Sequence, residues 1–117
     1  MKSKEASLKK QILDFLRLNK IFAWNNRNVG VYNPKTGHYI PSQIKGVSDI
    51  IGILPDGRFL AIEVKVNNNK PTIYQLAFLE EVLRNNGIAI LAYSLDDVID
   101  NLKDYLGENY VYNTTKS

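Results

Sequence analysis

Apolar residues recur along this chain in two patterns, one with helical spacing and one alternating or continuous, and segments of the two kinds follow one another. Helical spacing predicts three amphipathic helices, at residues 4–19, 72–86 and about 94–106. In the first helix the apolar face consists of Leu8, Ile12, Phe15 and Leu16, and the residues expected mostly on the other faces are Lys9, Lys10, Asp14 and Arg17. Runs rich in β-branched and aromatic residues predict strands at 21–24, 47–54, 58–66 and 88–93. A further hairpin is expected within 29–41, where Val29–Tyr32 and His38–Ile40 flank the turn sequence Asn33-Pro34-Lys35-Thr36-Gly37.

The order of these segments predicts an α/β fold with a mixed sheet flanked by helices. The strand–helix–strand unit at 59–93 requires a right-handed crossover, which makes its two strands parallel. The hairpin that precedes this unit is antiparallel. The run at 88–93 is almost continuously apolar and is expected to be a strand buried on both faces.

The second predicted helix carries its own start and stop signals. Thr72 and Gln75 have the spacing of a capping box, and Gly87 stands where a terminating glycine is expected. Gly107 is expected to end the third helix. The apolar side of the second helix is expected to consist of Ile73, Leu76, Leu79, Val82 and Leu83.

The hairpin at 47–66 has a register that follows from its loop, Pro55-Asp56-Gly57. If Leu54 pairs with Arg58, Asp49 lies directly opposite Glu63, with Cβ atoms about 5 Å apart. Lys65 points to the same face, because side chains alternate along a strand. Two opposed carboxylates repel each other and favour binding of a cation. We therefore predict a metal site for phosphodiester hydrolysis here.

Other polar residues near the predicted helices allow two interpretations. Glu5, one turn before Leu8, is either an acid favoured by the helix dipole or a carboxylate directed into a site; the residues alone favour the first. Gln75 fits the capping box, and a functional role facing the acid pair remains an alternative. His38 lies beside a predicted turn and is expected on the surface. Because it is the only histidine and Cys is absent, a histidine-rich zinc site is excluded.

Composition narrows the class of protein. The 117 residues suffice for one domain, with a core at about 5–106 and a tail at 107–117 that contains a candidate short strand at 110–112. Cys is absent, which excludes disulfides and thiolate metal sites and suits a reducing cytosol. We expect no membrane span, because no apolar run approaches about 20 residues, and no signal peptide. The net charge of +3 gives a mild preference for polyanions.

Five short motifs occur in an order that resembles a known family. They are Gly46-Val47-Ser48-Asp49, Ile50-Ile51-Gly52, Asp56-Gly57-Arg58-Phe59, Ile62-Glu63-Val64-Lys65 and Pro71-Thr72 followed by Gln75. Together they resemble the VRR-NUC group of the PD-(D/E)XK nuclease superfamily, over about residues 5–100. One departure is Ser48, where the family usually has Pro.

The resemblance implies a restriction-endonuclease-like αβββαβ core and a stand-alone, Holliday-junction-resolvase-like endonuclease that cuts DNA with Mg²⁺ or Mn²⁺. Asp49 and Glu63 would hold the metal, with the Val64 carbonyl and Glu5 as further metal-site groups. Lys65 would orient or activate the attacking water, and Gln75 would support the site.

Partners follow from the same resemblance and from charge. The expected substrate is DNA with a branched, flapped or junction structure, held through its phosphates. A homodimer or higher homo-oligomer is expected, and no organic cofactor. The basic residues expected to contact DNA phosphates are Lys4, Lys9, Lys35, Lys45 and Lys70, with Arg27 and Asn28 near the site.

Two alternatives to a nuclease stay open at this point. The first is a nucleic-acid-binding module that keeps the fold without catalysis; the presence of Asp49, Glu63 and Lys65 together argues against it. The second is that Asp49 and Glu63 merely pair with Lys65 on a solvated sheet face, which predicts no dependence on metal.

Overall fold

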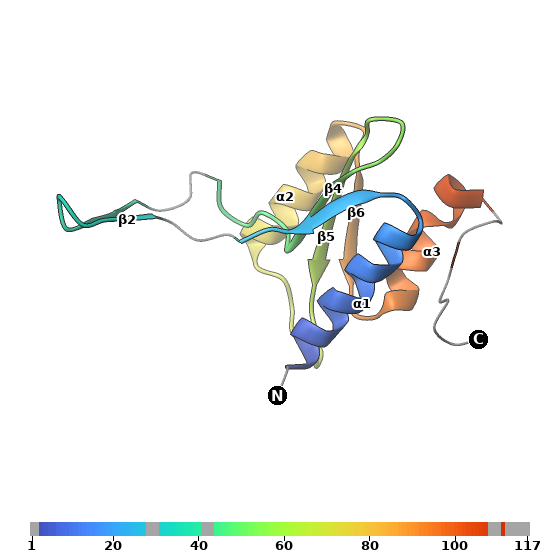
Figure 1. Ribbon diagram of the computed structural model, residues 1–117, viewed down its shortest axis with the longest axis horizontal. Coiled ribbons are helices and arrows are strands. Elements are labelled where there is room, and N and C mark those ends of the chain that lie inside the picture. The colour runs from blue at the N-terminus through green and yellow to red at the C-terminus, as the bar shows by residue number, and fades with distance from the viewer. Residues whose placement is uncertain (1–2, 28–30, 41–43, 108–110, 112–117) are drawn as a thin grey trace.

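The computed structural model describes residues 3–27, 31–40, 44–107 and 111. Its centre is a four-stranded sheet in the order β1-β4-β5-β6, with helices on both faces (Figure 1). The described elements are, in chain order, α1 (Lys4–Leu18), β1 (Phe22–Asn25), β2 (Val31–Asn33), β3 (His38–Ile40), β4 (Ile50–Ile53), β5 (Phe59–Val64), α2 (Ile73–Arg84), β6 (Ile88–Ala92) and α3 (Leu95–Leu106).

The sheet is mixed, as predicted. Strand β4 is antiparallel to both β1 and β5, whereas β5 and β6 run parallel on either side of the α2 crossover. The α/β class and the αβββαβ core are therefore confirmed, with the hairpin β2–β3 inserted between β1 and β4. The candidate strand at 110–112 lies outside the described residues except for Val111.

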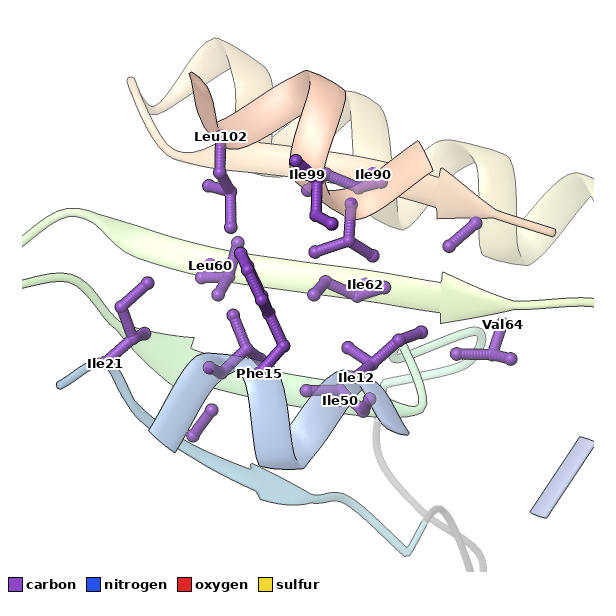
Figure 2. Packing of buried hydrophobic residues seen from close by; sticks show 14 of the residues in the cluster. Ile12, Phe15, Ile21, Ile50, Leu60, Ile62, Val64, Ile90, Ile99 and Leu102 are labelled. Carbon is purple, nitrogen blue, oxygen red and sulfur yellow. The ribbon is translucent and has the colours of Figure 1, made fainter. Parts of the chain in front are cut away.

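The main core lies between one sheet face and the helices α1 and α3 (Figure 2). Helix α1 buries Leu8, Ile12, Phe15 and Leu16, the residues predicted from their spacing. They pack on alternate residues of the central strands, including Ile50, Leu60, Ile62 and Val64. Burial of each large aliphatic side chain contributes about 1.5–3 kcal/mol, so a slip of the hairpin by one residue is strongly disfavoured.

The register of the β4–β5 hairpin is the predicted one. Ile50 pairs with Ile62 and Ile53 with Phe59, and the Leu54 N–H donates to the Arg58 carbonyl at 2.9 Å. Gly57 supplies the left-handed turn residue, with φ of 91°. The pairing, extended by one residue, sets position 49 against position 63.

The second sheet face is covered less completely. Helix α2 packs mainly against β5 and β6, and its Leu79 and Val82 form a small buried cluster with Ala61 of β5 and Ile51 of β4. The prediction that Ile73, Leu76 and Leu83 also face inward was wrong: they are 75, 46 and 58% exposed. A helix that covers only half of a sheet face does not bury so wide an apolar stripe.

Strand β6 differs from its prediction for a related reason. It forms the edge of the sheet, and Ile88, Ala89 and Leu91 are only partly buried. Continuous burial on both faces was therefore wrong for three of its five residues, although the strand itself lies where expected.

The ends of α2 and α3 match the predicted signals with one exception. Thr72 and Gln75 form a complete capping box, and Gly107 ends α3 with φ of 73°. At the end of α2, however, Asn86 rather than Gly87 takes the left-handed conformation, with φ of 66°. Gly87 donates to the Val82 carbonyl at 2.8 Å, and a side chain there would lie 2.8 Å from the Phe59 carbonyl. Glycine is required for close packing, not for its φ.

The hairpin around Asn33–Gly37 is confirmed. Val31 pairs with Ile40 and Asn33 with His38, and Figure 1 shows this hairpin extending away from the sheet and helices. The remainder of the predicted 29–41 segment, positions 29, 30 and 41, lies outside the described residues. Among the helices described, none has the length and apolarity needed to cross a membrane.

Candidate metal site

Asp49 and Glu63 come together at one end of the sheet, as the hairpin register predicts. Asp49 directly precedes β4, and its Oδ2 accepts a hydrogen bond from the Val64 N–H at 2.9 Å. Glu63 lies in β5 and is only 1% exposed. Glu63 therefore does not lie on a solvated sheet face. This argues against the alternative in which Asp49 and Glu63 merely pair with Lys65 on such a face.

Glu63 is electrostatically strained in its surroundings. Burial, and secondarily the neighbouring Asp49 carboxylate, raise the pKa of Glu63 to about 8. Lys65 opposes this shift, because its Nζ lies 3.6 Å from Glu63 Oε2. The second oxygen, Oε1, is buried and has no hydrogen-bond partner in the part of the chain that the structure describes. A cation beside Oε1 would satisfy it and favour the ionised carboxylate.

Lys9 joins this cluster from α1, where sequence periodicity placed it on another face. Its Nζ lies 3.1 Å from Glu5 Oε2 and 3.5 Å from Asp49 Oδ1. Although burial disfavours its charge, the hydrogen bond and charge of Glu5 and the charge of Asp49 raise the pKa of Lys9. The signal available in the sequence was the four-residue spacing from Glu5, together with the position of Lys9 next to the buried Leu8.

Glu5 is therefore tied to the site through Lys9. Its side chain is 42% exposed and does not reach the level of burial of Glu63. Within the described ranges, no three Asp, Glu or His side chains are close enough together to hold a metal ion by themselves. Glu5 as a metal ligand remains a prediction.

The backbone of Val64 faces Asp49, as its predicted role as a metal ligand through the carbonyl oxygen requires. The N–H and C=O of one residue in an extended strand point to the same side, and the Val64 N–H donates to Asp49. The next N–H, that of Lys65, donates to Ala92 of β6 on the opposite side, at 3.0 Å. The Val64 carbonyl therefore points toward the acid pair and is suited to a cation there.

Gln75 is brought to this end of the sheet by Gly46. A side chain at Gly46, which has φ of 79°, would overlap the Tyr74 carbonyl in the first turn of α2. The segment leading to Asp49 is thus packed directly on that turn. The Gln75 Oε1 accepts from the Thr72 N–H at 2.8 Å, which completes the capping box. A supporting role in the site remains a prediction.

Ser48, the one departure from the family pattern, is fully buried. Its hydroxyl has no hydrogen-bond partner among the residues that the structure covers.

The candidates for DNA contact divide into two groups. Arg27, Lys35, Lys45 and Lys70 are all exposed, and Asn28 lies outside the described residues. Arg27 follows Asn26, whose N–H donates to the Asp49 carbonyl at 2.7 Å, and Lys45 lies 5.0 Å from the centre of the Tyr74 ring. Lys35 lies instead in the β2–β3 turn, away from the sheet (Figure 1).

The donor atoms fit a hard divalent cation. Carboxylate oxygens and a backbone carbonyl are the ligand types that Mg²⁺ and Mn²⁺ take in proteins. One of these carboxylate oxygens, Glu63 Oε1, is buried without a hydrogen-bond partner in the described part of the chain. Asp49, Glu63 and the Val64 carbonyl approach from two adjacent strands, and Lys65 lies beside them.

Comparison with solved structures identifies the fold. A solved chain described as a VRR_NUC domain matches 89% of this chain and 98% of its own length, with a TM-score of 0.60 and 22% identity. The protein thus has the fold of a VRR_NUC domain, which confirms the fold that the resemblance of its motifs implies. No family model matches the sequence, and a search of curated proteins found no significant match.

Proposed function

We propose that this protein is a Mg²⁺- or Mn²⁺-dependent endonuclease that hydrolyses DNA phosphodiester bonds. The observation that carries the proposal is the buried Glu63, whose Oε1 has no hydrogen-bond partner among the described residues and which lies against Asp49 and beside Lys65. A buried carboxylate without a partner costs stability unless a ligand satisfies it. The VRR_NUC fold supports the same class of reaction.

Each residue has a distinct part in this proposal. Asp49, Glu63 and the Val64 carbonyl hold the ion, with Glu5 at the outer edge. When bound, the ion activates water and offsets the charge that develops on the phosphate. Lys65 guides the attacking water or takes its proton, and Gln75 keeps the first turn of α2 in place beside the site.

DNA is the substrate class that fits the surroundings of the site. Arg27, Lys45 and Lys70 lie in segments that adjoin the acid end of the sheet, and Lys35 lies in the turn of the β2–β3 hairpin. Such groups bind phosphates without reading sequence. We further propose that the protein prefers branched, flapped or junction DNA.

The test is cleavage of supercoiled, branched and single-stranded DNA by the purified protein in Mg²⁺, Mn²⁺ or EDTA. Cleavage is expected only with metal, and it should fall at least 100-fold in Asp49→Ala, Glu63→Ala and Lys65→Ala. Asp100→Ala, which removes an exposed carboxylate paired with Lys103 on α3, is the matched control and should leave cleavage unchanged. DNA binding without cleavage under every metal would favour the binding module instead.

We also propose a homodimer, supported by the open part of the second sheet face. Phe22, Ile53 and Phe59 are cross-strand neighbours in one row and are 68, 43 and 41% exposed. Sedimentation should show a dimer that Phe22→Glu converts to a monomer. The control Leu18→Glu changes an exposed apolar residue of α1, on the other side of the sheet, and should leave the dimer intact.

A further inference from the structure

Lys9 lies between two acids that belong to different elements. Glu5 belongs to α1, whereas Asp49 directly precedes β4, and Lys9 Nζ contacts both at 3.1 and 3.5 Å. The next residue, Lys10, pairs with Asp14, at 2.9 Å on the helix surface. The side chain of Lys9 is 22% exposed and that of Lys10 60% exposed, so the first lysine is partly enclosed by the site.

The two oxygens of Asp49 have different partners. Oδ2 accepts from the Val64 N–H, which holds it against β5, and Oδ1 faces Lys9. Oδ1 is therefore the oxygen that a divalent ion can take without breaking the bond to the strand. An ammonium group and a divalent ion cannot both occupy the direct contact with this oxygen, because their charges repel.

The charge balance favours replacement of Lys9 by a divalent ion. With the ion bound, Glu5, Asp49 and Glu63 are three carboxylates, and the ion and Lys65 together supply three positive charges. An ion with two charges compensates the acids more completely than one ammonium group does. Lys9 in turn has somewhere to go, because it also lines a groove of about 400 Å³ that runs along α1. The charged residues of that groove are Glu5, Lys9, Lys10, Asp14 and Arg17.

We propose that Lys9 is a positioning residue that competes with the divalent ion for Asp49 Oδ1. Without the ion, Lys9 holds Glu5 and Asp49 together. When the ion binds, Lys9 leaves Oδ1, and its ammonium group, in the groove beside Lys10 and Arg17, contacts a DNA phosphate. This inference rests on the proposed function, because it assigns the ion to Asp49 and DNA to the adjoining surface.

Titration calorimetry of the full chain with MnCl₂ alone tests the competition. Lys9→Met should bind Mn²⁺ roughly three- to tenfold more tightly than the unsubstituted protein, because no ammonium group must be displaced. Lys10→Met, the matched control, should change the affinity little, and Lys9→Arg, which keeps the charge, should not gain affinity. Equal or weaker Mn²⁺ binding by Lys9→Met would overturn the proposal.

Fluorescence anisotropy with labelled duplex DNA tests the second half. In EDTA, where Lys9 is engaged by Glu5 and Asp49, Lys9→Met should bind DNA about as well as the unsubstituted protein. In Ca²⁺, Lys9→Met should bind DNA several-fold more weakly than the unsubstituted protein. Lys10→Met should lose DNA affinity by the same factor in EDTA and in Ca²⁺. An equal loss for Lys9→Met in EDTA and Ca²⁺ contradicts the release of Lys9.

One further variant separates this inference from the proposed function. Asp49→Asn should bind Mn²⁺ at least tenfold more weakly than the unsubstituted protein. If Asp49→Asn binds Mn²⁺ normally, the metal site itself is wrong and both proposals fall. If it loses binding while Lys9→Met gains none, only the role of Lys9 is wrong.

Discussion

Asp49 and Glu63 stand opposite each other across the β4–β5 hairpin, and they differ sharply in their access to solvent: the side chain of Asp49 is 24% exposed and that of Glu63 2%. The pair is therefore asymmetric. The buried member, Glu63, has its pKa raised to about 8, so at neutral pH and without a metal it carries a proton. This asymmetry has two consequences that can be measured.

The first concerns stability without metal. The folded state binds the Glu63 proton more tightly than the unfolded state, in which the pKa of a glutamate is 4.5. The stabilising contribution is therefore fully present below about pH 4.5 and is lost as pH rises through about 8. Urea unfolding in EDTA should show a free energy of unfolding that falls by up to a few kcal/mol across this range.

Glu63→Gln is the control for this effect. Its amide keeps the shape and does not titrate, so the fall in the free energy of unfolding between about pH 4.5 and 8 should largely disappear. An unchanged pH dependence in Glu63→Gln would show that another group is responsible.

The second consequence concerns metal binding. An ion that takes Glu63 as a ligand must displace its proton below about pH 8. The apparent affinity for Mn²⁺ should therefore rise with pH up to about 8 and level off above it. Melting temperatures with and without Mn²⁺ should differ more at pH 8 than at pH 6. Glu63→Gln should lose this difference, whereas Asp100→Asn, on the exposed side of α3, should retain it.

The predictable parts of the site are those set by local chain geometry. The loop Pro55-Asp56-Gly57 sets the hairpin register, so the opposition of positions 49 and 63 follows from three residues. The capping box at Thr72 and Gln75 is local as well and was found for the same reason.

The parts that were missed depend on how separate elements pack. Lys9 lies forty positions before Asp49 in the sequence, and helical periodicity identifies the buried face of α1 without showing which of the lysines beside that face reaches Asp49. The apolar stripe of α2 likewise says which residues are suited to burial, not how much sheet lies beneath them. Ile73 and Leu83 remained exposed because that area is small.

Gly46 is expected to be essential for the position of α2. Gly46→Ala would strain the left-handed backbone and also push against the Tyr74 carbonyl, so it should destabilise the fold by more than about 2 kcal/mol. Gly57→Ala is the matched control, because its φ is also positive but a side chain there meets nothing within 4 Å; it should cost only about 1 kcal/mol. Urea unfolding of both variants measures the difference. Equal losses would mean that the contact between the 46–49 segment and α2 contributes nothing.

Ser48→Ala tests whether the departure from the family pattern carries a cost. The Ser48 hydroxyl is buried without a partner among the described residues, and such a group costs about 1–3 kcal/mol, of which removal should recover part. Because Ala leaves almost no cavity, Ser48→Ala should raise the free energy of unfolding by about 1 kcal/mol and leave metal affinity unchanged. Chemical denaturation and Mn²⁺ titration of the same preparation measure both quantities. A loss of stability would show that the hydroxyl is satisfied, and a loss of Mn²⁺ affinity would mean that it helps to hold Asp49 in place.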